Sequence, residues 1–528
     1  MLRGHNYIGS AKVISSGEFL RSYNPVTGEY MPERFYKASP DDVGKAADLA
    51  AAAFVLYRNV SPEDRARFLE AIGEELLSLD DALIQRARQE TGLPETRLTG
   101  ERGRTVGQLR LFASLIREGS WAEAVIDEAM PERQPAPRPD LRKMLFPIGP
   151  VAVFGASNFP LAFSTAGGDT ASALAAGNTV IVKAHPGHLG TNEMVASAII
   201  SAAEKTGMPD GVFSMIIGDQ PDESLALVTH EAVRAVGFTG SYKAGMNIFH
   251  AAINQRKEPI PVYAEMGSVN PVLILPQALR QDVEKITTQL AASITLGSGQ
   301  FCTNPGLLLV MDDPATEAFI DLLGRKMADV PASVMLSDGI CRTYVENNRK
   351  LIHHEQVEVL VSGAEPIDDN KAAATLLKVD AAHFIADEAL QEEVFGPLSL
   401  IVICKDTEEM ERALNCCRGQ LTGTVMATVE DMSDFRHCIG ILQDKVGRLI
   451  FNGVPTGVEV CHAMVHGGPF PATTFGHFTS VGADAIKRFT RPVCFQDWPQ
   501  EMLPDELKDG NPRHIMRKVN GVNISGKV

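Results

Sequence analysis

The spacing of apolar residues changes several times along the chain. Residues 5–36 carry short apolar runs separated by turn-forming pairs such as Asn24-Pro25, which predicts short strands and turns. From Ser61-Pro62 onwards the apolar positions recur every three or four residues, and a serine followed by proline and two acids is typical of a helix start. A second helix is expected over residues 101–116.

Between residues 151 and 265, short apolar runs alternate with longer helical stretches. Strands are expected at 151–154, 179–182, 212–217, 235–238 and 262–264, and helices at 162–176 and in the stretch that ends at Lys205. Strands that alternate with helices form parallel sheets through right-handed crossovers. The pattern therefore predicts a doubly wound α/β domain of the nucleotide-binding type.

The remaining chain divides into two further regions. A second α/β region begins at about residue 266, with its clearest strands at 271–275, 307–310 and 398–402. Residues 128–150 are rich in proline and arginine, and the chain after about 490 has no helical periodicity. The domains expected are a wound domain of residues 1–127 and 151–265, a second domain of 266–489, and an arm of 128–150 and 490–528.

Composition narrows the class of protein. The 528 residues are 45% hydrophobic and 22% charged, as in ordinary globular proteins, and the formal net charge of −17 argues against a nucleic-acid partner. No apolar stretch is suited to a signal peptide or a membrane span. The eight cysteines include no pair with zinc-site spacing, so we expect free thiols, no bound metal and a reducing, cytoplasmic location.

Three polar residues are candidates for chemistry. Cys302 follows the glycine-rich run 297–299, and Glu265 follows the last strand of the wound domain. Asn158 lies in the turn after the first of these strands, and from there its amide could donate to a developing oxyanion. Taken singly, these residues are better explained as a buried thiol, a surface carboxylate and a turn asparagine.

Longer motifs give a more specific indication. They are FGASNFP around Asn158, NTVIVK ending at Lys183, FTGS at 238–241, AEMGS around Glu265, GQFCT around Cys302 and EVFGP at 393–397. With these motifs in this order, the chain resembles the aldehyde dehydrogenase superfamily over nearly its whole length. The resemblance implies an NAD(P)-dependent α/β enzyme with a doubly wound cofactor domain, a catalytic domain and a small oligomerisation arm, assembled as a homodimer or homotetramer.

The family's catalytic roles fall on matching positions of this chain. Cys302 resembles the nucleophile, whose thiolate adds to the aldehyde carbon to give a thiohemiacetal. The amide of Asn158 and the backbone N–H of Cys302 would hold the oxyanion, and oxidation would leave a thioester. Glu265 resembles the base that activates water for hydrolysis of this thioester.

The resemblance also implies residues that bind the cofactor. They are Phe238, Thr239, Gly240, Ser241, Gly245, Glu393 and Phe395. No GxGxxG sequence is present, and the turn from Gly240 to Gly245 instead begins a helix whose backbone N–H groups can meet the pyrophosphate. Glu393 resembles the residue that holds the nicotinamide ribose, and Phe395 resembles the ring that packs near the nicotinamide.

The segment after the second wound strand predicts which cofactor is preferred. NAD-specific folds usually place an acid there to bind the ribose 2′-hydroxyl, whereas this chain has Pro186 at the matching position and its first acid at Glu193. A 2′-phosphate would meet no like charge, and Lys183 is nearby. We therefore expect NADP to be preferred, without excluding NAD. His185 is more readily a turn residue than a phosphate ligand.

Several further segments are more specific than the catalytic motifs; they include GHNYIGS near the N-terminus, GERGRTVGQLRLFA, PIPVYAEMGSVNP, GSGQFCTNPG and RPVCFQDWPQEMLPDELKDGNP near the C-terminus. Within the superfamily, these segments resemble the 2-oxoglutarate semialdehyde (2,5-dioxopentanoate) dehydrogenases most closely. The NADP-dependent long-chain fatty aldehyde dehydrogenases of bacteria are the alternative. A substrate with a carboxylate at its far end needs a cation, for which arginine is well suited. Arg104 and Gln108, four apart on one helix face, are candidates, although a solvated face explains Arg104 equally well. Phe159 and Phe470 could line a site for either substrate.

Two alternatives belong to other functional classes. A CoA-acylating enzyme would pass the thioester to a thiol and would not need Glu265 as a base. A non-catalytic binding protein would have no use for Cys302, Glu265 and Asn158 together. The three residues therefore favour a hydrolytic aldehyde dehydrogenase.

Overall fold

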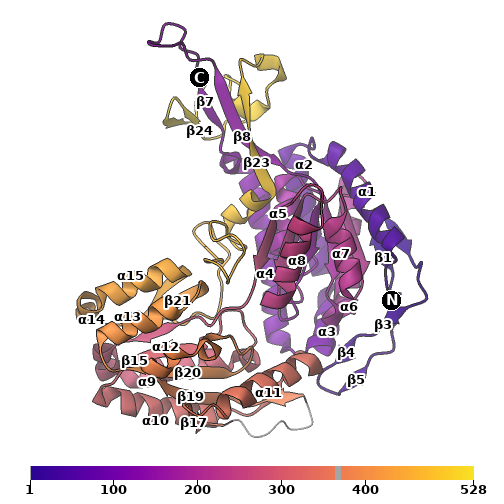
Figure 1. Ribbon diagram of the computed structural model, residues 1–528. Helices are drawn as coiled ribbons and strands as arrows, with labels where there is room; N and C mark the ends of the chain where they lie inside the picture. Colours follow the sequence, from indigo (N-terminus) through magenta and orange to yellow (C-terminus); the bar gives the residue numbers. More distant parts are fainter. Residues whose placement is uncertain (1, 363–369, 528) are drawn as a thin grey trace.

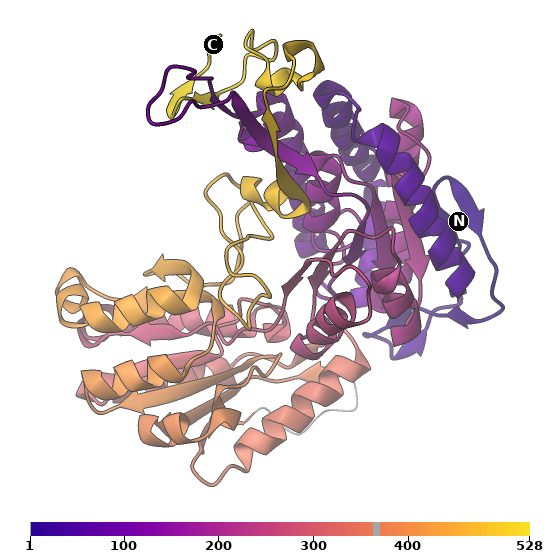
Figure 2. The ribbon, with the colours of Figure 1, turned by 45° about the horizontal axis from the view of Figure 1, so that its top comes forward.

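The computed structural model describes residues 2–362 and 370–527, which are arranged around three main sheets (Figure 1). The first sheet has the strand order β13-β12-β9-β10-β11-β1-β2. The second has the order β17-β19-β20-β15-β14-β21-β22, and the third has the order β23-β8-β7-β24-β25. The third sheet projects from the first. The second sheet, with its own helices, lies beside the first (Figures 1 and 2).

The first sheet confirms the predicted doubly wound arrangement. Its strands are β1 Asn6–Ile8, β2 Ala11–Val13, β9 Val151–Phe154, β10 Val180–Ala184, β11 Phe213–Ile217, β12 Ala235–Thr239 and β13 Val262–Glu265. Strands β9 to β13 run parallel, and β1 and β2 add antiparallel strands at one edge. The strand order reverses between β9 and β12, so the turns that follow these two strands open into one crevice.

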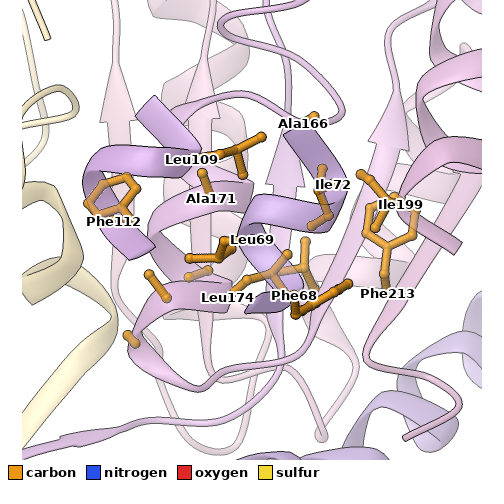
Figure 3. Close-up of a cluster of buried hydrophobic side chains, with 14 of the residues drawn as sticks. Phe68, Leu69, Ile72, Leu109, Phe112, Ala166, Ala171, Leu174, Ile199 and Phe213 are labelled. Carbon is orange, nitrogen blue, oxygen red and sulfur yellow. The ribbon is translucent and has the colours of Figure 1, made fainter. Parts of the chain in front are cut away.

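Helices cover both faces of this sheet because its strands are apolar on both sides. Val153 of β9 packs into one core, while Ala152 and Phe154 pack into the other. The helices are α1 Pro40–Tyr57, α2 Pro62–Ser78, α3 Asp80–Thr91, α4 Glu95–Glu118, α5 Gly168–Ala176, α6 Leu189–Thr206, α7 Pro221–Thr229 and α8 Tyr242–Asn254. Figure 3 shows the core formed by α2, α4, α5 and α6, in which Phe68 and Phe213 are fully buried.

Two predicted helices differ from the observed ones in extent. The helix expected at 101–116 begins earlier, at Glu95, directly after the extended Pro94. The helix expected at 162–176 begins only at Gly168. Two backbone N–H groups of the turn before it donate to the buried carboxylate of Glu101, at 2.8 and 2.9 Å, which holds that turn in a non-helical form.

The second sheet forms the expected second α/β region. Its strands are β14 Val272–Ile274, β15 Leu307–Met311, β17 Glu358–Val361, β19 Thr375–Asp380, β20 Leu398–Cys404, β21 Gln420–Met426 and β22 Val446–Phe451. All pair in parallel except β17. The associated helices are α9 Pro276–Thr295, α10 Pro314–Ala328, α11 Asp338–Ile352, α12 Ala381–Ala386, α13 Thr407–Cys416, α14 Val429–Asp434 and α15 Arg436–Lys445.

The third sheet combines segments from distant parts of the sequence. Its strands are β7 Val125–Asp127, β8 Leu141–Pro147, β23 Thr490–Gln496, β24 Arg517–Val519 and β25 Val522–Ile524. Four of these strands lie in the stretches predicted as the arm, whereas β7 precedes the predicted start at residue 128. Residues 452–482 link β22 to this sheet by passing between the first two sheets (Figures 1 and 2).

The remaining strands form two-stranded ribbons. They are β3 Phe19–Leu20 with β6 Phe35–Tyr36, β4 Tyr23–Asn24 with β5 Glu29–Tyr30, and β16 Ser333–Val334 with β18 Lys371–Ala372. The first two ribbons are the short strands expected near the N-terminus. None of the described helices is both long and apolar enough to span a membrane.

Candidate active site

A strained turn presents Cys302. Helix α9 ends at Thr295, and the three residues 297–299 then adopt positive φ values. A Cβ atom at Gly299 would lie 2.3 Å from the backbone of Gly396. Only glycine permits this approach, so the turn brings the loop of Cys302 against the EVFGP segment.

Three side chains converge at the thiol. Sγ of Cys302, Nε2 of His466 and a carboxylate oxygen of Glu265 lie within 4.8 Å of one another. The His466 Nε2 atom is 3.6 Å from Sγ and 2.9 Å from Oε1 of Glu265. The hydroxyl of Ser480 donates to Oε2 of Glu265 at 2.6 Å. Glu265 and His466 are buried and Cys302 is half-buried, so the thiol is the accessible corner of the cluster.

The surroundings shift the pKa values of the thiol and the carboxylate in opposite directions. Burial, reinforced by the negative charge of Glu265, raises the pKa of Cys302 well above its ordinary value. Burial also opposes ionisation of Glu265, but the charge and hydrogen bond of His466 and the hydrogen bond of Ser480 outweigh it and lower the pKa of this carboxyl. The cluster therefore pairs a protonated thiol with an ionised carboxylate that can take its proton.

Asn158 is held against the loop of the thiol. Its Nδ2 atom donates to the carbonyl oxygen of Gln300 at 3.0 Å, two residues before Cys302. Its own carbonyl oxygen accepts a hydrogen bond of 2.5 Å from Nη2 of Arg97. The guanidinium of Arg97 lies 4.6 Å from the ring centroid of Phe301. The predicted nucleophile, base and amide donor thus come from one cluster of loops.

Lys183 lies near the carboxyl end of β10, where a cofactor phosphate was expected. Burial lowers the pKa of its ammonium group to about 8. The nearby Asp219 is paired with Lys37 at 2.8 Å. Glu193 is also occupied, because it accepts the backbone N–H groups of Arg3 and Gly4. Within the described ranges, Lys183 has no ion-pair partner.

His185 and Pro186 shape the turn after β10. Nδ1 of His185 accepts the backbone N–H of Gly187 at 3.1 Å, and its ring stacks on His188 with centroids 5.1 Å apart. Burial lowers the pKa of His185 well below its ordinary value, so its imidazole is neutral. Pro186 opens a short 3₁₀ helix, Pro186–His188. His185 therefore caps this turn, and neither His185 nor Pro186 carries a charge.

The turn after β12 leads into α8 on the other side of the crevice. Phe238 and Thr239 end the strand, and Ser241 caps the helix through a hydrogen bond from the N–H of Ala244. A Cβ atom at Gly240 would lie 2.7 Å from the ring of Phe238. Phe238 thus packs beneath the turn and leaves the helix N-terminus open to a ligand.

Glu393 and Phe395 line a pocket together with Phe301 and Gly299. Burial raises the pKa of Glu393 to about 7. A Cβ atom at Gly267 would collide with the carboxylate of Glu393, at 2.1 Å. The pocket adjoins the loop of Cys302, because Phe301 and Asn304 on either side of this residue line it.

The four predicted substrate residues lie in different surroundings. Arg104 packs 5.0 Å from the ring centroid of Phe163, and both of its Nη atoms are buried without a hydrogen-bond partner in the described part of the chain. Nε2 of Gln108 is similarly unpaired. Phe159 packs on Phe301, whereas the exposed Phe470 packs on Tyr242 at the start of α8.

Sequence reasoning did not find several residues of the site. His466 and Ser480 come from the linking segment 452–482, which has no periodicity that would place it. The sequence also did not predict a role for Asn270. Its Nδ2 donates to the carbonyl oxygens of Cys302 and Asn304 at 2.9 Å each. A histidine inside the glycine- and proline-rich run HGGPFP was the one available signal.

Comparisons with known proteins agree on the family of this chain. The profile of the aldehyde dehydrogenase family matches residues 13–493. The chain is 51% identical over 521 residues to alpha-ketoglutaric semialdehyde dehydrogenase 2 of Azospirillum brasilense, covering 98% of this chain and 99% of that one. It is 45% identical over 520 residues to alpha-ketoglutaric semialdehyde dehydrogenase of Acinetobacter baylyi, covering 98% of each.

Solved structures agree on the fold. Methylmalonate-semialdehyde dehydrogenase from Oceanimonas doudoroffii superposes with a TM-score of 0.80 over 94% of this chain and 99% of that chain, at 22% identity. The chain belongs to the aldehyde dehydrogenase family, which confirms the resemblance found in its motifs. It is an oxidoreductase that acts on aldehydes with a nicotinamide cofactor.

Proposed function

We propose that this chain oxidises 2-oxoglutarate semialdehyde, also called alpha-ketoglutaric semialdehyde, to 2-oxoglutarate, with NADP as the preferred cofactor. The relatives in Azospirillum and Acinetobacter carry the name of this substrate. The observation that carries the proposal is Arg104, whose buried Nη atoms have no partner among the described residues. Its charge acts on both Cys302 and Glu265, so a substrate carboxylate bound to it would hold the aldehyde near the thiol.

The catalytic steps follow from the arrangement around the thiol. Cys302 loses its proton to Glu265 as sulfur bonds to the aldehyde carbon, and the amide of Asn158 stabilises the resulting oxyanion. When bound, the nicotinamide supplies the acceptor for the hydrogen and two electrons that leave this carbon. Glu265 passes this first proton to solvent and can then remove a proton from water, whose oxygen displaces the sulfur from the thioester. The proton taken from water returns to the sulfur and regenerates the thiol. The product is the carboxylate.

His466 and Ser480 act in this scheme as positioning residues. Nε2 of His466 lies 2.9 Å from one carboxylate oxygen of Glu265, at ion-pair distance, and the hydroxyl of Ser480 donates a hydrogen bond of 2.6 Å to the other. The carboxylate therefore stays beside Cys302 through both proton transfers. A base kept in this position supports hydrolysis over transfer of the acyl group to CoA.

The residues that follow β10 and β12 support the proposal of a phosphorylated dinucleotide as the cofactor. Lys183 is a half-buried cation with no ion-pair partner in the described ranges. The nearby Asp219 is paired with Lys37, and the charges of Glu223 and Asp219 act on Lys183. We assign it to the ribose 2′-phosphate, with the start of α8 at the pyrophosphate and Glu393 at the nicotinamide ribose. Neutral His185 and Pro186 add no charge that would repel the 2′-phosphate.

The substrate assignment is tested by comparing kcat/KM for 2,5-dioxopentanoate, succinate semialdehyde, glutaraldehyde and dodecanal, each with NADP and with NAD. We expect 2,5-dioxopentanoate with NADP to be preferred. Arg104→Ala should raise KM for the two charged aldehydes at least about tenfold and leave dodecanal unchanged, as expected for loss of a charge-assisted pair. Arg110→Ala is the matched control, because Arg110 lies on the same helix and is exposed.

The outcomes of this comparison are distinct. If the kcat/KM for dodecanal exceeds that for 2,5-dioxopentanoate by more than about tenfold, the chain is a fatty aldehyde dehydrogenase and the substrate proposal is wrong. If Arg104→Ala slows the oxidation of dodecanal equally, Arg104 does not bind the substrate carboxylate.

The eight free cysteines support a reducing, cytoplasmic location.

A further inference from the structure

The cluster at the thiol has the geometry of a metal site. Sγ of Cys302 and Nε2 of His466 are 3.6 Å apart, and Nε2 lies 2.9 Å from Oε1 of Glu265. Tetrahedral zinc, with bonds of about 2.0–2.3 Å, spaces such ligand atoms about 3.3–3.6 Å apart. Small side-chain rotations within a cluster no wider than 4.8 Å would reach these spacings.

The chemistry of the three side chains selects zinc. Thiolate and imidazole bind borderline-soft cations, whereas Mg²⁺ and Ca²⁺ require a fuller set of oxygen ligands. The thiolate of Cys302 and the carboxylate of Glu265 together neutralise the two charges of Zn²⁺, which reduces the cost of placing it in a buried site. Ser480 already orients Glu265 through its second oxygen, at 2.6 Å.

Access to the cluster is from the side of the thiol. Glu265 is 3% exposed and His466 is 1% exposed, whereas Cys302 is only half-buried. A cation would therefore enter where an aldehyde must enter, and water would complete the tetrahedron. Arg104 opposes the cation, because its positive charge acts on Cys302 and Glu265. Binding is thus expected to be reversible by a chelator.

We propose that Cys302, His466 and Glu265 form an inhibitory Zn²⁺ site. On binding, the S–H bond of Cys302 breaks, a Zn–S bond forms and the proton passes to solvent. The proton on Nε2 of His466 is likewise lost to solvent as the Zn–N bond forms, so no oxidation state changes. The ligated sulfur cannot attack an aldehyde, so Zn²⁺ competes with the aldehyde. Because a proton is released, Zn²⁺ affinity rises with pH over the range in which the free thiol is protonated.

The test measures Zn²⁺ binding to the cofactor-free full chain by competition with a chromophoric chelator. No substrate is present, so the result does not depend on the proposed function. Wild-type protein should bind one Zn²⁺ per chain at this site. Cys302→Ser and His466→Asn should each weaken binding at least about tenfold, since even the loss of an outer-shell partner costs 10–100-fold. Mg²⁺ should not compete.

The matched control is the double variant Cys461→Ser/His462→Asn, which removes a neighbouring Cys-His pair outside the cluster. It should bind Zn²⁺ as tightly as the wild type. Circular dichroism and Tm establish that each variant is folded. Equal affinity in the wild type and the folded His466→Asn variant would overturn the proposal, as would loss of binding only in the double variant. In aldehyde oxidation assays, Zn²⁺ that lowers kcat without raising the KM for the aldehyde would also contradict the proposal.

Discussion

His466 determines the charge state of Glu265. Its charge and its hydrogen bond are the two largest influences that lower the pKa of this buried carboxyl against the effect of burial. Glu265 must be ionised to accept a proton from Cys302 or from water. Without the imidazole, the pKa of Glu265 rises, and a larger fraction of the protein carries a protonated, inactive base at a given pH.

His466→Phe is therefore expected to move the acid limb of the pH–kcat/KM profile to higher pH and to lower kcat about 10²-fold at neutral pH, in the range that general bases contribute. His466→Gln can still donate a hydrogen bond and should therefore recover part of kcat. The acid limb of its pH–kcat/KM profile should remain at the higher pH. The measurement is the profile of each variant with a saturating cofactor. An unchanged limb in His466→Phe would exclude an electrostatic role.

Lys183 gives the cofactor preference its own pH dependence. Burial lowers the pKa of its ammonium to about 8, so in the free protein the cation is present below that pH and is lost above it. The KM for NADP should rise as pH passes upward through 8, while the KM for NAD should stay level. Lys183→Ala should raise the KM for NADP at all pH values and abolish this difference. Parallel curves for the two cofactors would contradict the assignment.

At the scale of elements, the sequence predicted the positions of the strands more accurately than the positions of the loops that carry the catalytic residues. Apolar runs such as 151–154 and 235–238 mark strands because both faces of the wound sheet are buried. The loop of Cys302 was found by its glycines. Residues 452–482 carry no such pattern, because their fold is imposed by contacts with β13 and with the Cys302 loop. His466 was therefore invisible until the chain was folded.

Helix α4 shows the same limit. The sequence predicted it over 101–116, which left Arg97 outside. The observed helix presents Arg97, Glu101 and Arg104 at intervals of four and three residues, on the face that meets the turn after β9. Arg97 binds the carbonyl of Asn158, and Glu101 binds the turn that follows it. One helix thus organises the oxyanion donor and the proposed carboxylate site.

Glu101→Ala should destabilise the protein. The substitution leaves the N–H groups of Leu161 and Ala162 buried without an acceptor, each at a cost of about 1–3 kcal/mol. Glu101→Gln retains an acceptor and should be milder. The exposed Glu95, on the same helix, supplies the control Glu95→Ala. Urea unfolding measures the change, and equal midpoints for Glu101→Ala and Glu95→Ala would refute the structural role.

On the described part of the molecule, exposed apolar side chains occur on the edge of the second sheet and on the third sheet. Strand β22 is the last strand of the second sheet, and Leu449 and Phe451 on it are 42% and 55% exposed. The third sheet with its flanking turns exposes Trp498, Met502 and Val522. An open sheet edge with apolar side chains favours pairing with another chain. We propose that the third sheet of one copy covers the β22 edge of a second copy, which gives the arm its function.

This arrangement predicts the effect of a single charge on the assembly. Phe451→Glu places a carboxylate at the centre of the proposed contact, where it would lose its water without gaining a partner. The variant should therefore shift from an oligomer toward a monomer in size-exclusion chromatography with light scattering. Leu56→Glu on α1, at a side chain that is 64% exposed, should leave the mass unchanged. Because Cys302, Glu265, His466 and Asn158 all come from one chain, the monomer should still form the thioester, and an oligomer of wild-type mass in Phe451→Glu would show that β22 is not the contact.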